Sequence, residues 1–390
     1  MNLAIFDIAL KIHLTGYMSY LPRATYSILK AQLYKGKTIL LYGARRVGKT
    51  ALIQKLIEEE QGVYLNAEYG QIRDALSTTN TTQLQDLVGH HKLIAFDEVQ
   101  SIAGIGKILK VLYDHFPQVQ FIATGSSAFE LQNAIAESLI GRSRKYILYP
   151  LSMGELKTAF GPIDAYARID NILRYGMYPE ILSLSEDGKK TELSNIVSNY
   201  LFKDAIMLGA MKRPDLLLEI LRLLAFQIGH EVNLNELSNK LNTSIHTVQR
   251  YLYFLEQSFI IVRLGALSRN LRNEIGKSRK YYFLDLGIRN AVINNFNPLA
   301  IRNDVGQLWE NFCVLERMKK NEYTQRHVNM YFWRTYEQKE IDYIEEIDGK
   351  FYVFEFKWNE PAGKSPKVFL EAYPGSEYKV ITKENFREFI

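Results

Sequence analysis

The chain has 390 residues, a net charge of +5 and a hydrophobic content of 47%, which allows more than one core and roughly two to four domains. The single cysteine, Cys313, excludes a disulfide framework and a cysteine-ligated zinc site, and it favours a reducing, cytoplasmic location. Asp7, Lys11 and His13 interrupt the apolar N-terminus and no long uncharged run follows, so we expect neither a signal peptide nor a membrane partner.

Residues 37–60 have the pattern of a strand, a glycine loop and a helix. GARRVGKT, residues 43–50, separates the apolar run KTILLY from the helical pattern KTALIQKLIEEE. The glycines let backbone N–H groups face one anion where the helix dipole begins. Lys49 would reach the β- and γ-phosphates of ATP, and Thr50 would ligate Mg²⁺. A chance match in a loop is the alternative. We expect the nucleotide to contact Gly43, Ala44, Arg45, Arg46, Val47, Gly48, Lys49, Thr50 and Ala51.

A second acidic strand end follows in HKLIAFDEVQ. The apolar run 93–96 does not alternate, which is typical of a central strand buried on both faces, and it ends in Asp97 and Glu98. In open α/β sheets ligands bind at the carboxyl ends of the strands. Asp97 is therefore predicted to hold Mg²⁺ through water, and Glu98 to act as the general base. A helix N-terminus with acidic first-turn residues is the alternative.

A third apolar run, VQFIATGSS at residues 119–127, ends in small hydroxyl residues. Thr124 or Ser126 could hydrogen-bond the γ-phosphate or the attacking water, and we favour Ser126. The three runs predict an α/β domain with a parallel sheet.

These motifs carry a family resemblance. GARRVGKT, the Asp-Glu strand end, ATGSSAFEL and ESLIGRSRKYILYPLSMGEL resemble prokaryotic AAA+ ATPases whose C-terminal half is a domain of unknown function. The resemblance implies that the chain forms a homo-oligomer and that residues 1–150 form an ATPase core. Residues 1–20 of this core are an N-terminal extension that the resemblance does not cover. It also implies that Arg142, with Arg144 behind it, reaches a neighbouring subunit's γ-phosphate. A surface arginine at the sheet edge is the alternative.

Helical periodicity predicts an all-α lid over 151–228, in which RYGMYPE, residues 174–180, is either a nucleotide-facing break or an ordinary turn. Residues 229–295 follow as a helix, a turn near Asn242, an amphipathic helix and two strands, which predicts a winged helix.

We expect the winged helix to contact DNA through its basic loop, although a solvated loop or a protein partner is the alternative. The loop and its flanks carry one acidic residue, Glu274, and six basic residues: Arg263, Arg269, Arg272, Lys277, Arg279 and Lys280. The recognition helix should expose His246, Gln249 and Arg250.

The last region, 296–390, combines a helix with alternating strands. Asp348-Gly349 predicts a hairpin turn that pairs Ile347 with Lys350, and the same register places Asp342 opposite Glu355 and Glu340 opposite Lys357. Two opposed carboxylates repel each other unless a cation lies between them.

Asp342, Glu355 and Lys357 match the PD-(D/E)xK nuclease signature, and the resemblance adds Glu310. It implies a restriction-endonuclease-like domain in which Glu310, Asp342 and Glu355 hold Mg²⁺ and Lys357 positions the nucleophile. An ion pair between Glu340 and Lys357 on a solvated face is one alternative, and a core that binds without cleaving is another. The sequence thus predicts a Mg²⁺-dependent AAA+ ATPase whose nucleotide cycle positions a winged helix and a nuclease-like domain on DNA, or a nucleotide-switched module whose C-terminal core is inert.

Overall fold

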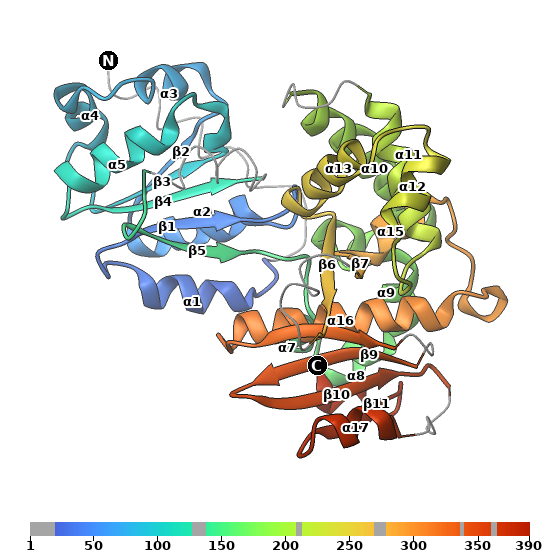
Figure 1. The fold of residues 1–390 in the computed structure, drawn as a ribbon. Coiled ribbons are helices and arrows are strands. Elements are labelled where there is room, and N and C mark those ends of the chain that lie inside the picture. The colour runs from blue at the N-terminus through green and yellow to red at the C-terminus, as the bar shows by residue number, and fades with distance from the viewer. Residues whose placement is uncertain (1–19, 127–137, 208–212, 269–277, 336–338, 360–364) are drawn as a thin grey trace.

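Two β-sheets joined by helices organise the chain (Figure 1). The computed structural model describes residues 20–126, 138–207, 213–268, 278–335, 339–359 and 365–390. In Figure 1 the first sheet forms the N-terminal lobe, a helical region lies beside it, and the second sheet lies below that region at the C-terminus.

The first sheet is five-stranded and parallel, with the order β2-β3-β4-β1-β5. Its strands are β1 Thr38–Tyr42, β2 Val63–Asn66, β3 Leu93–Asp97, β4 Gln120–Gly125 and β5 Ser143–Ile147. Helix α1 Ala24–Gln32 precedes β1, and the segments between the strands form α2 Lys49–Glu60, α3 Gly70–Ala75, α4 Thr81–Val88, η1 Val99–Ser101 and α5 Ile105–His115. The predicted α/β domain with a parallel sheet is confirmed.

Both faces of this sheet are covered, which explains why its strands do not alternate between apolar and polar residues. Ile39 and Leu41 of β1 share one core with α1 and α2, whereas Leu40 and Tyr42 share the other with α4 and α5. The carboxyl ends of β1 and β3 point toward the helical region (Figure 1). The two motifs that follow these strands therefore lie between the two lobes.

Between residues 151 and 228 the regular secondary structure of the described residues is helical, as the periodicity predicts, and loops such as 176–178 separate the helices. The elements are α7 Met153–Phe160, α8 Pro162–Ala167, α9 Ile169–Tyr175, η2 Pro179–Ser183, α10 Glu186–Met207 and α11 Pro214–Phe226. A capping box begins α7, because the Ser152 side chain accepts from the Glu155 N–H and the Glu155 side chain accepts from the Ser152 N–H.

A helix, a tight turn and a second helix come next, α12 Leu234–Lys240 and α13 Ile245–Gln257. Asn242 in the turn has a φ of 46°, a left-handed conformation that asparagine tolerates. The hairpin of β6 Ile261–Ala266 and β7 Arg279–Phe283 follows, and then α15 Leu286–Val292 and η3 Leu299–Ile301. The basic residues Arg269, Arg272 and Lys277 lie outside the described residues.

The second sheet is six-stranded, with the order β11-β10-β9-β8-β6-β7. Its remaining strands are β8 Asn329–Arg334, β9 Glu340–Ile347, β10 Lys350–Phe356 and β11 Glu377–Ile381, and its helices are α16 Val305–Tyr323, α17 Lys367–Ala372 and α18 Phe386–Phe389. Because β6 pairs in parallel with β8, the sheet crosses the boundary that we expected near residue 295. The hairpin predicted for a wing is thus continuous with the C-terminal sheet.

Helix α16 connects these parts. It contacts α1, α9, α15, β7 and β10, and Figure 1 shows it running along the C-terminal sheet beneath the helical region. Among the described residues, no helix is both long enough and apolar enough to cross a bilayer.

Candidate functional site

The loop after β1 has the geometry of a phosphate-binding loop. Gly43 has a φ of 153° and Gly48 a φ of 94°, and a Cβ at Gly43 would lie 2.3 Å from the Leu148 carbonyl oxygen. Only glycine fits at that position. The Lys49 ammonium folds back under the loop and donates to the carbonyl oxygens of Gly43 at 2.8 Å and Ala44 at 2.9 Å. The first turn of α2, Lys49 to Leu52, carries no acidic residue, so its N–H groups and the helix dipole favour an anion there.

Asp97 at the end of β3 lies next to this loop and accepts hydrogen bonds on both oxygens. Oδ2 accepts from Thr50 Oγ1 at 2.7 Å and from the Tyr64 hydroxyl at 2.6 Å, while Oδ1 accepts from the Thr124 hydroxyl and from the Glu98 N–H at 3.1 Å. Burial, together with the bond to Asp97, raises the pKa of Tyr64, so this hydroxyl stays protonated and donates. The structure thus brings Thr50 and Asp97 together, as the metal prediction requires.

Glu98 adopts a left-handed backbone, with a φ of 53°, directly after the strand. Such a conformation costs about 1 kcal/mol or more for a residue with a Cβ. The Glu98 N–H donates to Asp97 Oδ1 at 3.1 Å and to Thr124 Oγ1 at 3.3 Å. Gln100 donates from one amide nitrogen to the Glu98 carboxylate and, at 3.2 Å, to Ser126 Oγ. The predicted base and Ser126 therefore lie on either side of Gln100.

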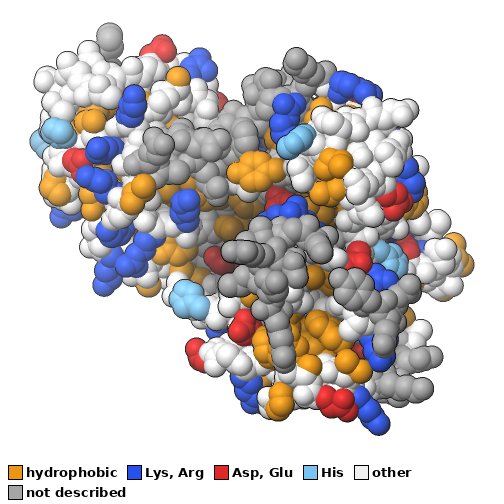
Figure 2. Space-filling view, in the orientation of Figure 1, with side chains coloured by type: hydrophobic (Ala, Val, Ile, Leu, Met, Phe, Trp, Pro, Cys, Tyr) orange, Lys and Arg blue, Asp and Glu red, His pale blue; other side chains and the backbone are white. Residues whose placement is uncertain are grey.

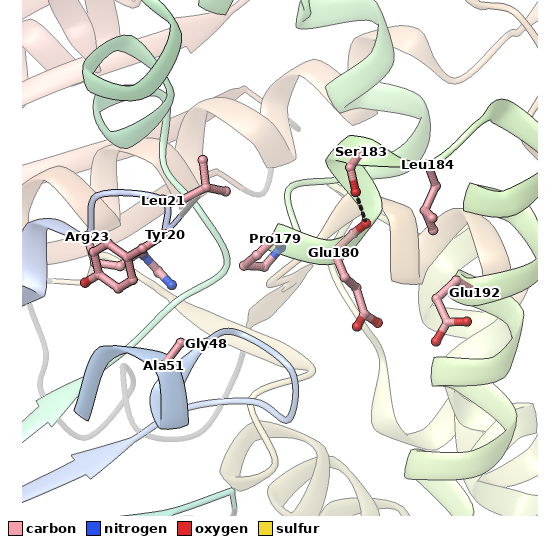
Figure 3. Close-up of a pocket in the computed structure, with 10 residues that line it drawn as sticks. All are labelled: Tyr20, Leu21, Arg23, Gly48, Ala51, Pro179, Glu180, Ser183, Leu184 and Glu192. Carbon is pink, nitrogen blue, oxygen red and sulfur yellow. Dashed lines mark hydrogen bonds between the residues drawn. The ribbon is translucent and has the colours of Figure 1, made fainter. Parts of the chain in front are cut away.

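A cavity of about 490 Å³ opens beside the loop (Figure 3). Gly48 and Ala51 line one side of it, Pro179 and Glu180 of η2 line another, and Tyr20 lies next to Arg23 on a third. The break in RYGMYPE therefore faces the P-loop side of the cavity rather than an unrelated part of the surface. Tyr20 is the last residue of the segment for which the sequence predicted no function.

Two arginines tie the loop to the helical region. Arg46 bonds Glu180 at 2.6 Å and also bonds Glu192 of α10. The buried Arg23 donates to the Val47 carbonyl and, at 3.0 Å, to Glu155 of α7. The loop is therefore joined to two separate lid elements by charged contacts.

Arg142 lies directly before β5, and its carbonyl accepts the N–H of Thr38 at the start of β1. The P-loop follows the opposite end of β1, so within one chain Arg142 is remote from the predicted nucleotide. It forms an ion pair with Asp114 at 2.9 Å, and Arg144 donates to Gln32. Basic side chains gather on the lower part of the N-terminal lobe in Figure 2. The role predicted for Arg142 in a neighbouring subunit stays a prediction.

The four residues predicted for a nuclease centre also meet. Pairing of β9 with β10 runs from Ile347↔Lys350 to Tyr343↔Phe354, as the hairpin prediction requires, and the Asp342 carboxylate just beyond it accepts the Phe356 N–H of β10. The Asp342 carboxylate acts with burial to raise the pKa of Glu310 and of Glu355, and the Lys357 ammonium opposes the increase at Glu355. Their catalytic and metal-binding roles stay predictions.

Lys280 corrects one sequence interpretation. We counted it among the six basic residues through which the loop and its flanks would contact DNA, but its side chain is 0% exposed. It forms ion pairs with Glu310 at 3.1 Å and with Glu340 at 2.6 Å. Lys280 and Tyr282 lie on the same face of β7, and Tyr282 donates to Glu310 at 2.7 Å. A count of charges along the chain could not reveal which face of the strand Lys280 occupies.

The Lys280 ammonium supplies a positive charge to the carboxylates around it. Burial lowers the pKa of Lys280, but Glu310, Asp342 and Glu340 outweigh that effect and raise it, so an ammonium ion already occupies the cluster. Asp342 Oδ2 accepts the Phe356 N–H at 2.9 Å. In the part of the chain that the structure describes, no group of three or more His, Cys, Asp or Glu side chains could hold a metal ion.

The sequence did not predict Tyr64, Gln100 or Arg23 as site residues. Tyr64 is 33 positions from Asp97 and Arg23 is 132 positions from Glu155, so only the fold brings these pairs together. Gln100 lies two positions from Glu98, and its amide next to an acidic strand end was the one local signal available.

Comparison with known families agrees with this geometry. A family model described as an AAA domain matches residues 35–157, which contain the P-loop, Asp97 and Glu98. With the contacts above, this match defines an AAA-like P-loop ATPase domain. Two further models, each described as a domain of unknown function, match residues 166–299 and 305–389. The ATPase part of the sequence resemblance is therefore confirmed, whereas its nuclease part stays a prediction.

Curated relatives are named only as uncharacterized proteins. One from Haemophilus influenzae is 29% identical over 276 residues, covering 65% of this chain and 68% of its own length. One from Mycobacterium tuberculosis is 26% identical over 337 residues, 84% of this chain and 72% of its own, and one from Methanocaldococcus jannaschii is 24% identical, with 75% and 69% covered.

Solved structures resemble the chain only loosely. A Walker-type ATPase of Pyrococcus abyssi aligns with a TM-score of 0.49 at 16% identity, over 70% of this chain and 96% of that one. A signal transduction ATPase with numerous domains from Pyrococcus horikoshii aligns with a TM-score of 0.31 at 13% identity, over 78% and 46%. Scores of this size add nothing to the assignment.

Proposed function

We propose that the chain binds ATP with Mg²⁺ at the P-loop and hydrolyses it, and that ATP binding and hydrolysis change the positions of the helical region and the C-terminal sheet. The observation that carries the proposal is the 2.7 Å hydrogen bond between Thr50 and Asp97 beside the uncapped N-terminus of α2. A hydroxyl and a carboxylate in that position fit Mg²⁺, which proteins commonly bind through one or two oxygens plus the phosphates of the substrate.

The residues of the site have distinct tasks in this proposal. Magnesium held by Thr50 and Asp97 would neutralise charge on the phosphate oxygens. Lys49 exchanges the loop carbonyls that it now contacts for phosphate oxygens, and the N–H groups at the start of α2 bind the same anion. Glu98 takes a proton from water while the water oxygen bonds to the γ-phosphorus, and the bond from that phosphorus to the bridging oxygen of ADP breaks.

A substitution at the base tests this assignment. Glu98→Gln should bind ATP with nearly the wild-type affinity but hydrolyse it about 100-fold or more slowly, because the amide cannot accept the proton. Glu68→Gln, which changes an exposed acid near the same sheet edge, is the matched control and should turn over normally. Normal turnover in Glu98→Gln would remove Glu98 from its proposed role.

A continuous set of buried contacts runs from the P-loop to helix α16 and supports an effect of the bound nucleotide on the C-terminal sheet. Arg23 joins the Val47 carbonyl to Glu155, and Glu155 belongs to the capping box at the start of α7. The Met153 N–H of the same helix turn donates to Glu316 of α16 at 2.7 Å. A shift of the P-loop would therefore act on the helix that carries Glu310.

We propose DNA binding as a second function, because α13 presents a polar, partly basic face. His246, Gln249 and Arg250 are exposed, while Val248 and Leu252 are buried beneath them. Fluorescence anisotropy with duplex DNA should give binding that weakens steeply with salt, because phosphate contacts release counterions. The His246→Ala, Gln249→Ala, Arg250→Ala triple variant should bind more weakly, and equal binding by that variant would exclude α13 as the contact.

Of the two C-terminal alternatives, the structure's charge arrangement favours the module that does not cleave. Lys280 forms an ion pair with Glu310, one of the carboxylates that the nuclease resemblance assigns to Mg²⁺. A nicking assay on supercoiled DNA with Mg²⁺, comparing the wild type with Asp342→Ala, should show no cleavage that depends on Asp342.

A further inference from the structure

The carboxylate cluster at the end of the C-terminal sheet has a cation built into it. Glu310 comes from α16, Glu340 and Asp342 come from β9, and the Lys280 ammonium from β7 lies among them. Lys280 is 0% exposed, and its ammonium also lies 5.4 Å from the centre of the Phe332 ring, so the charge is shielded from water.

Such a lysine persists only if its neighbours compensate for the lost hydration. Removing an ammonium ion from water is strongly unfavourable unless it is paired and hydrogen-bonded. Two direct ion pairs supply that compensation, and the Tyr282 hydroxyl binds the Glu310 oxygen that also contacts the ammonium. Arg334 approaches Glu340 to 3.9 Å from the outer side.

The cluster also combines residues from two separate regions of the chain. Lys280 belongs to the region matched by one domain model, residues 166–299, whereas its carboxylate partners belong to the next, residues 305–389. An antiparallel bridge between Glu231 and Lys280, and the 3.1 Å ion pair of Glu231 with Arg334, lie beside it. The charged contacts therefore join the β6–β7 hairpin to α16 and β9.

We propose that Lys280 is the resident cation of this cluster, that it holds the hairpin onto the C-terminal sheet, and that it keeps divalent cations out. A Mg²⁺ or Mn²⁺ ion at the same carboxylates would meet a fixed positive charge within hydrogen-bond distance of its ligands. The cluster then serves as a structural junction between the two regions. This inference does not depend on ATP hydrolysis at the P-loop.

Removal of the ammonium gives the test. In nucleotide-free full-length protein with chelator present, Lys280→Met should melt several degrees below the wild type, because buried carboxylates lose their partner. Addition of Mn²⁺ should raise the melting temperature of Lys280→Met and titrate one added metal site by Mn²⁺ EPR. Both effects should disappear when Asp342→Asn is added to Lys280→Met.

Lys319→Met is the matched control, because Lys319 is equally buried but bonds one carboxylate, Glu316 at 2.8 Å, and the Leu151 carbonyl. It should be destabilised without gaining a Mn²⁺ site. Two results would overturn the proposal: Mn²⁺ binding by the wild type that Asp342→Asn abolishes, or a folded Lys280→Met that gains no metal site. If Lys280→Met does not fold under any condition, the proposal is tested by comparing Mn²⁺ binding in the wild type and in Asp342→Asn.

Discussion

Tyr64 holds the acidic residue of the nucleotide site in place. Its hydroxyl and Thr50 Oγ1 share Asp97 Oδ2, at 2.6 and 2.7 Å. Partners behind a metal ligand fix its orientation, and their loss typically weakens metal affinity or activity about 10- to 100-fold.

Tyr64→Phe should therefore raise the Mg²⁺ concentration needed for half-maximal ATP hydrolysis by about 10-fold. The ring stays in place, so the melting temperature should change little. Tyr69→Phe, at a tyrosine that is 66% exposed, is the control. An unchanged Mg²⁺ requirement in Tyr64→Phe would show that Asp97 is oriented without this bond.

Asp285 gives the protein a pH-dependent stability. The carboxylate caps α15 and accepts the Met177 N–H at 2.6 Å and the Ile288 N–H at 3.2 Å, and burial raises its pKa from 3.8 to about 6. Because the pKa of Asp285 is higher in the folded protein than in the unfolded chain, the folded protein binds more protons between pH 3.8 and about 6. The resulting stabilisation is complete below the unfolded pKa and is lost as the pH rises through the folded one.

At 1.36 kcal/mol per pKa unit, the free energy of unfolding should fall by on the order of 3 kcal/mol across that window from this group. Asp285→Asn keeps an acceptor oxygen but does not titrate. Urea denaturation at several pH values should show a fall in the wild type that is smaller in Asp285→Asn, and equal pH dependence in both proteins would contradict the assignment.

At the scale of elements, the contact between the P-loop and the lid is charged. Glu180 of η2 and Glu192 of α10 bind Arg46 and also line the cavity next to Gly48. Two carboxylates facing the proposed position of a triphosphate oppose its binding.

The Glu180→Gln, Glu192→Gln double variant should therefore bind ATP about 5- to 10-fold more tightly, as calorimetry would measure, which corresponds to roughly 1 kcal/mol. Glu186→Gln changes an exposed glutamate on the same helix that pairs with Arg174 and should leave the affinity unchanged. Weaker binding by the double variant would mean that these carboxylates contact the nucleotide favourably.

Local patterns predicted individual elements well and their long-range pairing poorly. The glycine loop, the buried strand before Asp97 and the Asp348-Gly349 hairpin follow from short-range rules that act within a few residues. The pairing of Gly265 with Tyr331 joins strands far apart in the chain, and no turn residue encodes it. For the same reason the count of basic residues included Lys280, whose side chain is buried and pairs with Glu310 of α16.

At the scale of the whole molecule, Arg142 and the P-loop lie at opposite ends of the first sheet. If Arg142 acts on a γ-phosphate, it acts in a second copy of the chain. The specific ATPase activity of the wild type should then rise with protein concentration, in parallel with the mass measured by light scattering in the presence of ATP.

Arg142→Ala should bind ATP normally but turn over at least about 10-fold more slowly at every concentration, because charge that develops at the γ-phosphate loses a partner. Arg144→Ala is the neighbouring control. A monomeric wild type with activity independent of concentration would assign Arg142 only to its ion pair with Asp114.

The central claim is that the P-loop site binds Mg²⁺ and ATP through Lys49 and Asp97. Isothermal titration calorimetry of ATP with Mg²⁺ into the wild type and into Lys49→Ala tests it most directly. We predict saturable binding by the wild type and a loss of about 100-fold or more in affinity in Lys49→Ala, because a buried charge-assisted contact is removed. Wild-type protein that takes up no ATP, or equal affinity in the two proteins, would contradict the account.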